Sequence, residues 1–307
     1  MDSPETSSNP PLLAGIEAGG TKYVCAVGHD PENPLSEIRF PTGEPGDTIG
    51  EAVNFFREAI EQYGPIGAMG IGTFGPADIN SRSSGYGGIL TTPKPGWAGY
   101  NVVSALRERM GESVPITFET DVNAAAVGEA EFGAAIQKRN VCYITIGTGI
   151  GGGFLHDGVP LHGRMHPEIG HMLVPNLEGE YEMSNPGSVC PFHDNCIEGF
   201  ASGPAIEKRW GAPGHELSDD HPAWDLQARY LAHGCVNLTA AWSPDVIIIG
   251  GGVIQQKGLI PRIREHFAKL AGDYWGNLPP MEDYIQEPGL GQQAGIVGAL
   301  ALAQRLL

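Results

Sequence analysis

The pattern of apolar and polar positions divides the chain into strand pairs joined by glycine turns and amphipathic helices. The stretches 12–28 and 141–161 each place apolar and β-branched residues on both sides of a glycine turn, and no helical periodicity follows either turn. A third glycine turn, within 246–254, follows a continuous apolar run that is typical of a buried strand. The two strand pairs indicate an internal duplication, in which each pair begins one half of a two-lobed α/β protein.

Helices are predicted where apolar residues recur at three- and four-residue intervals. The stretches with this spacing are 47–63, 121–136, 223–242, 258–275 and 293–307. A short apolar strand is predicted at 114–118, directly before the second of these helices. Segments rich in Pro and Gly are predicted loops, at 41–47, 75–99, 175–191 and 210–222.

Charge and length narrow the classes of protein that fit this pattern. The 307 residues carry a formal net charge of -18, which argues against a nucleic-acid partner because binding to a phosphate backbone needs clustered Lys and Arg. Any bound phosphate must therefore be held by backbone N–H groups and a metal ion. The polar, acidic start differs from a signal peptide, and no apolar run is long enough for a membrane span. We therefore expect residues 1–12 to be a disordered lead and the protein to be cytoplasmic.

The glycine turns suit phosphate binding, although they differ from the common phosphate motifs. A Walker loop and a Rossmann turn both open a helix, whereas these turns return into a strand. Without Cβ atoms, successive backbone N–H groups can form a concave nest around an anion. The alternative is that they are simple hairpin turns. The candidate residues are Gly19, Gly20, Thr21, Lys22, Gly147, Thr148, Gly149, Gly251 and Gly252.

Two acidic residues at strand ends are open to two interpretations each. Glu17 lies just before the first turn, where its carboxylate could hold Mg²⁺ directly or through water, or could be a surface charge. Asp121 lies where the strand at 114–118 gives way to an alanine-rich helix. It is either the N-cap of that helix or a base that accepts the proton of an alcohol attacking phosphorus, and both roles are compatible.

Four metal-binding side chains occur close together in one loop region. A C-x2-H-x2-C pattern lies nineteen residues after a histidine, and two thiolates with two imidazoles match the tetrahedral preference of Zn²⁺. These residues are His171, Cys190, His193 and Cys196, with His162 and His166 as nearby competitors for the first position. Four protein ligands imply a closed, structural site. The other three cysteines, Cys25, Cys142 and Cys235, are predicted to be buried packing residues.

A metal that fixes this loop would also orient two neighbouring carboxylates. Glu168 precedes His171 by three residues, and Glu198 follows Cys196 by two. Carboxylates held in place are good hydrogen-bond acceptors for sugar hydroxyls. Glu168 and Glu198 are therefore candidate acceptors for the hydroxyls of a sugar.

Five motifs together resemble the ROK family (repressors, open reading frames and sugar kinases), within it the bacterial fructokinases of Bacillus type. The resemblance is collinear from about residue 13 to the end. It is carried by "GIEAGGTKYVCAVG", "ETDVNAAAVGEAEFGA", "ITIGTGIGGGF", "HPEIGH" and "CPFHDNCIEGFASGPAI". It implies the actin-like ATPase fold, with two RNase H-like lobes and with ATP and sugar in the cleft between them. The lobes would be 13–120, completed by a C-terminal helix at about 293–307, and 121–292.

The resemblance also implies roles for individual residues. Asp121 would be the general base, the two glycine hairpins would bind the phosphates of ATP, and the cluster would bind structural zinc. His171 would bind zinc through one ring nitrogen while the other faces the sugar. The sugar contacts would be Asn101, Glu168, His171 and Glu198. Three positions depart from common family patterns, namely Glu17 in place of Asp, His193 in place of Cys and Thr120 in place of Asn.

The resemblance thus implies an ATP- and Mg²⁺-dependent hexose kinase that converts D-fructose to fructose 6-phosphate, and it implies a homodimer because dimers are common among such enzymes. Kinases for mannose, glucose or an N-acetylated amino sugar are alternatives. A sugar-sensing regulator without catalysis is an alternative from another class, and we would expect it to carry a basic DNA-binding segment ahead of the first hairpin. Only a dozen acidic and polar residues precede that hairpin.

Overall fold

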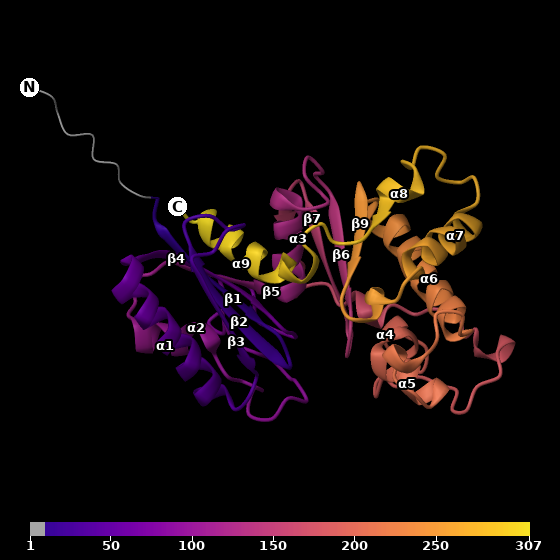
Figure 1. The fold of residues 1–307 in the computed structure, drawn as a ribbon, viewed down its shortest axis with the longest axis horizontal. Coiled ribbons are helices and arrows are strands. Elements are labelled where there is room, and N and C mark those ends of the chain that lie inside the picture. Colours follow the sequence, from indigo (N-terminus) through magenta and orange to yellow (C-terminus); the bar gives the residue numbers. More distant parts are fainter. Residues whose placement is uncertain (1–9) are drawn as a thin grey trace, which may run out of the picture. The chain divides into compact units, whose positions relative to one another are not determined.

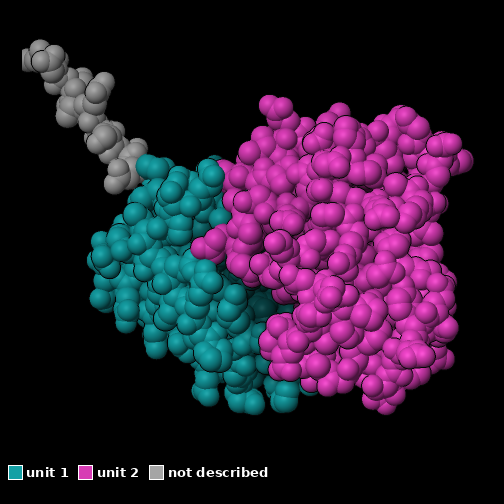
Figure 2. Space-filling model, turned by 45° about the vertical axis from the view of Figure 1, so that its right-hand side comes forward, with its two compact units in different colours: residues 1–128, 295–307 teal, residues 129–294 magenta. Residues whose placement is uncertain are grey.

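The computed structural model describes residues 10–307 and contains two compact units (Figures 1 and 2). The first unit consists of the chain up to Gly128 together with Gly295–Leu307, and the second of Glu129–Ala294. The chain thus passes from one unit to the other inside a helix at Gly128 and returns at Gly295. Most of the predicted lead at 1–12 lies outside the described residues.

The first unit is built on a five-stranded sheet with the order β3-β2-β1-β4-β5. The first glycine hairpin forms its centre, because β1 pairs antiparallel with β2 on one side and parallel with β4 on the other. The strands are β1 (Leu12–Ala18), β2 (Lys22–Gly28), β3 (Ser36–Pro41), β4 (Ile66–Thr73) and β5 (Ile116–Thr120). The predicted strand–turn–strand at 12–28 is confirmed.

Helices cover both faces of this sheet. On one face, Ile16 and Cys25 pack with apolar residues of α1 (Pro45–Tyr63) and α2 (Val102–Met110). On the other face, Leu13 of β1 packs with residues of α9 (Ala294–Gln304). Because successive side chains of a strand alternate between faces, Glu17 lies on the α9 side of β1. The Glu17 carboxylate can therefore contact groups on the α9 side of the sheet only.

Glycines allow α9 to approach the sheet backbone very closely. A Cβ atom added to Gly70 of β4 would lie 1.9 Å from the carbonyl oxygen of Ala299. A Cβ added to Gly298 would lie 1.7 Å from the carbonyl oxygen of Ala124, in α3 (Asp121–Phe132). The sheet, α3 and α9 therefore meet with no room for side chains at these points.

The second unit repeats the strand arrangement of the first. Its sheet has the order β10-β9-β6-β7-β8, in which a glycine hairpin, β6–β7, again has a parallel strand beside its first member. Read from the other edge, this order is equivalent to that of the first sheet, as the predicted duplication requires. The strands are β6 (Val141–Ile146), β7 (Ile150–His156), β8 (Val159–Pro160), β9 (Val246–Gly250) and β10 (Ile285–Gln286).

The helices of the second unit lie beside this sheet (Figure 1), and their apolar residues form one large core with those of the strands. They are α4 (Ile197–Ala201), α5 (Gly203–Trp210), α6 (Ala223–Trp242), α7 (Leu259–Ala271) and α8 (Met281–Tyr284). Cys142 and Cys235 are fully buried in this core, and Cys25 is fully buried in the first unit, which confirms their prediction as packing residues. None of the helices in residues 10–307 has the length and apolarity needed to cross a bilayer.

The predicted helices are present, but several end earlier than expected. The helix predicted at 121–136 ends at Phe132, and the Ala134 N–H donates to the side chain of Glu129 at 2.7 Å instead of continuing the helical pattern. The carboxylate of buried Glu129 accepts hydrogen bonds from the backbone N–H groups of Ala134, Gly289 and Leu290. Helices α2 and α5 and strand β4 were not predicted.

Candidate active site and metal centre

The first glycine turn exposes its backbone between β1 and β2. Its N–H at Gly19 donates to the carbonyl of Lys22 at 2.9 Å, while Gly20 and Thr21 are exposed. A Cβ added to Gly19 would lie 2.7 Å from the Lys22 carbonyl oxygen, so this position requires glycine. The hydroxyl of Thr42 donates to the Gly19 carbonyl at 2.7 Å and fixes the turn from outside. The turn is thus rigid, with unshielded backbone at its tip.

Asp121 begins α3 directly after β5, and it is not the capping acceptor of that helix. The hydroxyl of Thr120 accepts the N–H of Asn123 at 3.2 Å, which is the geometry of an N-cap. The Asp121 carboxylate instead accepts the N–H of its neighbour Val122 through Oδ1 at 2.9 Å. Thr120 therefore caps α3, and the Asp121 carboxylate lies at the first residue of the helix.

Glu17 carries a buried carboxylate oxygen in need of a partner. Its Oε2 has no hydrogen-bond partner within residues 10–307, and the carboxyl carbon would lie 2.7 Å from a Cβ added to Gly295 of α9. Burial raises the pKa of Glu17 above its ordinary value of 4.5, although Lys22 and Arg39 act in the opposite direction. A hard cation is the ligand that such an orphaned oxygen fits, so Glu17 suits Mg²⁺. Its interpretation as a plain surface charge is less consistent with this burial.

A first prediction follows from the raised pKa of Glu17. The folded state favours its protonated form, so its contribution to stability is present below pH 4.5 and is lost as the pH rises through the folded pKa. We expect Glu17→Gln to raise the urea midpoint at pH 8 in magnesium-free buffer, by a margin that shrinks towards pH 4.5. Glu58→Gln, on the exposed face of α1, should change stability by less than about 0.5 kcal/mol. An equal gain at both pH values would contradict this account.

Asn101 uses its side chain inside the first unit. Its Oδ1 accepts the N–H of Ser104 at 2.8 Å and caps α2, while its Nδ2 donates to the carbonyl of Tyr86 at 2.9 Å. The amide therefore braces the loop 85–86 against the start of α2. Its role as a sugar contact stays a prediction.

The second and third glycine turns lie against each other in the second unit. The turn between β6 and β7 is closed by a hydrogen bond from the Gly147 N–H to the Gly149 carbonyl at 2.9 Å, and Thr148 is exposed at its tip. Gly251, after β9, has φ of 94°. A Cβ there would lie 2.4 Å from the carbonyl oxygen of Ile146, at the end of β6. The residues of this unit that are expected to bind phosphate therefore lie together at the carboxyl ends of β6 and β9.

The structure brings the four predicted metal ligands together. The ligand atoms of His171, Cys190, His193 and Cys196 all lie within 4.8 Å of one another. The Cys190 sulfur lies 3.9 Å from His171 Nδ1 and 3.5 Å from His193 Nδ1. Tetrahedral Zn²⁺, with bonds of about 2.0–2.3 Å, fits these donors and this spacing. His171 is the histidine in the cluster, while His166 lies next to Glu168, with Nδ1 3.5 Å from Oε1.

Two of the four metal ligands lie at short helical elements that contact each other, and Cys190 and His193 lie in the loop before the second of these elements. His171 ends the 3-10 helix η1 (Ile169–His171), and Cys196 precedes α4 and caps it by accepting the Gly199 N–H at its sulfur. The N–H of Ile197 donates to the Met172 carbonyl at 2.9 Å, which joins the two elements. The ligand cluster thus forms at an existing junction of the backbone.

The two predicted sugar-binding carboxylates flank this junction. Burial raises the pKa of Glu168, the His171 side chain lowers it, and the nearby Glu198 carboxylate adds to the rise. Oε2 of Glu198 accepts the backbone N–H of Ile150 at 2.9 Å. The two carboxylates therefore lie close enough to interact electrically.

A buried ion pair that the sequence analysis missed holds the loop between the first and second metal ligands. Glu178 accepts from Arg209 Nε at 2.8 Å through Oε1 and from the Gly187 N–H at 2.7 Å through Oε2. Arg209, only 1% exposed, also donates to the Phe200 carbonyl and lies over the rings of Phe200 and Tyr230. No local motif marks this pair, because its members are 31 positions apart in the sequence.

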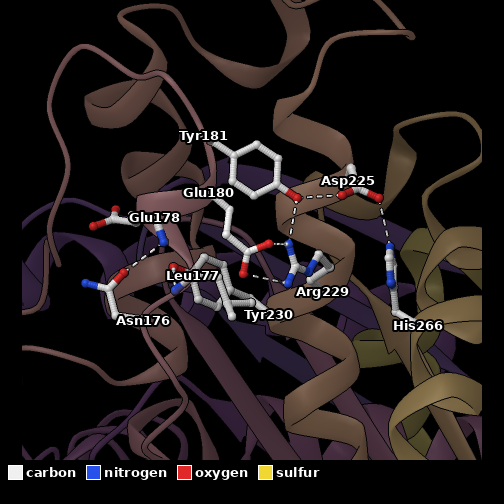
Figure 3. Close-up of polar contacts among 9 residues, drawn as sticks. All are labelled: Asn176, Leu177, Glu178, Glu180, Tyr181, Asp225, Arg229, Tyr230 and His266. Atoms are coloured by element: carbon white, nitrogen blue, oxygen red, sulfur yellow. Dashed lines mark hydrogen bonds and ion pairs between the residues drawn. The ribbon is translucent and has the colours of Figure 1, made fainter.

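Surface contacts attach the same loop to α6 and α7 (Figure 3). The hydroxyl of Tyr181 donates to Asp225 at 2.5 Å, and the other oxygen of Asp225 accepts from His266 Nε2 at 2.8 Å. Arg229 binds both carboxylate oxygens of Glu180, at 2.7 and 3.1 Å. These contacts and the buried pair fix the loop from two directions.

A second prediction concerns the buried pair. Replacing Arg209 by Ala leaves the Glu178 carboxylate buried without its cation, which costs about 3–5 kcal/mol. We expect a corresponding fall in the urea midpoint of the metal-loaded protein. Lys208→Ala is the matched control, because Lys208 is the neighbouring cation and donates to the same loop from the surface. An equal fall in the urea midpoint for Arg209→Ala and Lys208→Ala would contradict the stabilising role of the buried pair.

Comparison with known proteins agrees with this combination of duplicated sheets, glycine turns and a four-ligand metal cluster. The chain belongs to the ROK family, whose model matches residues 13–306. It is 43% identical to a fructokinase from Pediococcus pentosaceus, over 96% of this chain and 99% of the relative. It is 42% identical to a putative fructokinase from Bacillus subtilis, over 96% of each chain.

A solved structure supports the fold assignment. The ROK hexokinase from Thermus thermophilus superposes with a TM-score of 0.78 at 28% identity, covering 96% of this chain and 98% of the other. The actin-like fold predicted from the sequence is therefore confirmed, as is the membership of the ROK sugar kinases.

Proposed function

We infer that the protein is a fructokinase, an enzyme that transfers the terminal phosphoryl group of ATP to the 6-hydroxyl of D-fructose. The observation that carries this inference is the near full-length similarity, at more than 40% identity, to the fructokinase from Pediococcus pentosaceus and to the putative fructokinase from Bacillus subtilis. The site supports it, because glycine turns, an aspartate at a helix start and paired carboxylates beside a metal cluster are all present in one chain.

Asp121 is the general base in this proposal. It accepts the proton of the sugar hydroxyl while that oxygen forms a bond to the terminal phosphorus, and the bond from phosphorus to the ADP oxygen breaks. The first turn of α3 favours the ionised carboxylate, because the N-terminal end of a helix carries partial positive charge. Thr120, and not Asp121, accepts the capping N–H of Asn123.

The glycine turns bind the phosphates of ATP in this proposal. Gly19–Lys22, Gly147–Gly149 and Gly251–Gly252 contribute the hydroxyls of Thr21 and Thr148 and backbone N–H groups other than those of Gly19 and Gly147, which close their own turns. Glu17 would hold the Mg²⁺ that accompanies ATP, and the ion when bound neutralises charge on the phosphates. This assignment needs no cluster of basic residues, which agrees with the net charge of -18.

The sugar contacts are Glu168, His171, Glu198 and Asn101, and the zinc is structural. Four protein ligands leave no open position on the metal for a reacting water. His171 directs Nδ1 towards Cys190, so its other ring nitrogen is the one assigned to the sugar. The base Asp121 belongs to the first compact unit, which extends to Gly128, and the sugar-binding carboxylates Glu168 and Glu198 belong to the second. We further propose a cytoplasmic homodimer.

A panel of sugars tests the substrate. We expect ADP release from Mg-ATP with a kcat/KM for D-fructose at least about 10-fold above those for mannose, glucose and N-acetylglucosamine, a ratio that corresponds to about 1.4 kcal/mol of preferential transition-state binding. A clear preference for another sugar would reassign the substrate and keep the kinase. Absence of ADP release with every sugar, in folded and zinc-loaded protein, would favour the alternative of a sugar-binding regulator.

A further inference from the structure

The second glycine turn is held at both ends by the segment that follows the metal ligand Cys196. At one end, the Ile150 N–H donates to Oε2 of Glu198 at 2.9 Å. At the other, the Gly203 N–H donates to the Gly147 carbonyl at 2.8 Å. Residues 198–203, comprising most of α4 and the start of α5, therefore determine the position of this turn.

The packing at these contacts is too close for water to separate the two parts. A Cβ added to Gly149 would lie 2.7 Å from Glu198 Oε2, and one added to Gly203 would lie 3.1 Å from the Gly147 carbonyl oxygen. The η1 element also touches the turn, because a Cβ added to Gly170 would lie 1.9 Å from the Ile150 carbonyl oxygen. Both elements that carry metal ligands thus rest on the same few backbone atoms of the hairpin.

A single carboxylate can serve both the turn and a sugar. Two carboxylate oxygens offer about four acceptor positions, and the bond from Ile150 uses one of them. Glu168, the other predicted sugar-binding carboxylate, contacts His166 at 3.5 Å instead of the hairpin backbone. The two acidic residues therefore differ in one respect that an experiment can separate.

We propose that Glu198 is a positioning residue for the nucleotide as well as a contact for the sugar. Its bond to the Ile150 N–H holds the second glycine turn in the shape that accepts phosphate, and the metal cluster acts on nucleotide binding through Cys196 and α4. The proposal rests on the proposed function, since it requires that this turn binds the phosphates of ATP.

Calorimetric titration with Mg-ADP in the absence of sugar tests the proposal. We expect Glu198→Ala to weaken Mg-ADP binding by about 10-fold or more, the scale of one lost hydrogen bond to a charged group. Glu198→Gln keeps an oxygen acceptor for the Ile150 N–H and should bind Mg-ADP within about 3-fold of the parent. Glu168→Ala is the matched control and should leave Mg-ADP affinity unchanged. All three variants should bind fructose more weakly.

Hydrogen exchange gives a second measurement that does not depend on ligand binding. The peptide that contains Ile150 should exchange faster in Glu198→Ala than in the parent, and at the parent rate in Glu198→Gln and Glu168→Ala. If Glu198→Ala fails to fold, the Gln variant decides alone. Parent-like Mg-ADP affinity in Glu198→Ala would overturn the proposal. So would a Glu198→Gln protein whose Mg-ADP affinity falls by as large a factor as its fructose affinity. Failure of the parent itself to bind Mg-ADP would refute the proposed function instead.

Discussion

Asp121→Asn is expected to lower kcat by about 10²–10⁴-fold, the usual contribution of a general base. Asparagine has the same shape but cannot accept the hydroxyl proton, while its side-chain oxygen can still accept the Val122 N–H. The helix start should remain intact, because Thr120 and not Asp121 caps α3. We therefore expect the dissociation constants for fructose and Mg-ADP to stay within about 3-fold of the parent values, since the lost interaction belongs to the transition state.

Asp47→Asn provides the matched control for this substitution. Asp47 is also an aspartate in the first turn of a helix of the first unit, but it is exposed and lies in α1. Its replacement should leave kcat within about 2-fold of the parent, as expected for a residue that makes no transition-state contact. Turnover by Asp121→Asn equal to that of Asp47→Asn would remove Asp121 from the mechanism.

The second large effect is expected from the metal cluster. His193→Ala removes one of four ligands, and we expect the zinc content, measured by plasma mass spectrometry, to fall from one per chain towards zero. Metal-binding energy is coupled to folding where the site forms only in the folded chain. Each kcal/mol of lost unfolding free energy lowers the melting temperature of a domain of this size by about 2–4 °C. We therefore expect the melting temperature to fall by about 5–15 °C.

The same substitution should weaken fructose binding, because His171 and the two carboxylates depend on the junction between η1 and α4. His215→Ala is the control, since His215 is exposed and lies outside the cluster. Zinc at one per chain in His193→Ala, with unchanged melting temperature, would show that the metal site was assigned wrongly. Unchanged fructose affinity after full loss of zinc would separate the cluster from the sugar site.

The sequence predicted the parts of the fold that are formed by residues close together in the chain. The hairpins at 12–28 and 141–161 alternate strand, glycine turn and strand over a short distance, so their pairing needs no distant partner. The cluster of metal ligands was predictable for a related reason, because Cys190, His193 and Cys196 lie within seven residues.

Strand β4 was missed because tertiary packing determines its composition. Its sequence, IGAMGIGT, contains three glycines, which are poor strand formers. Gly70 is needed because α9 lies directly on its backbone, and Gly72 because a Cβ would lie 2.7 Å from that of Ala124. No pattern within the strand predicts these neighbours, because they come from distant parts of the chain.

Helix α2 was missed because it is short, with only Val102, Val103 and Leu106 buried.

The sequence also could not identify the residue that caps α3. Sequence preference allows both Thr120 and Asp121 to cap, and only the hydrogen bond from Asn123 identifies Thr120. The contacts of Glu178, Arg209 and Glu198 connect positions far apart in the sequence, so their roles needed the structure.

The most direct test of the central claim is identification of the product by ³¹P NMR. Zinc-loaded protein with Mg-ATP and D-fructose should give ADP and one phosphate ester in equal amounts, with the ester on the 6-hydroxyl, while the Asp121→Asn protein gives almost none in the same time. A phosphate ester at another position, or ADP formed with inorganic phosphate and no sugar ester, would contradict the account.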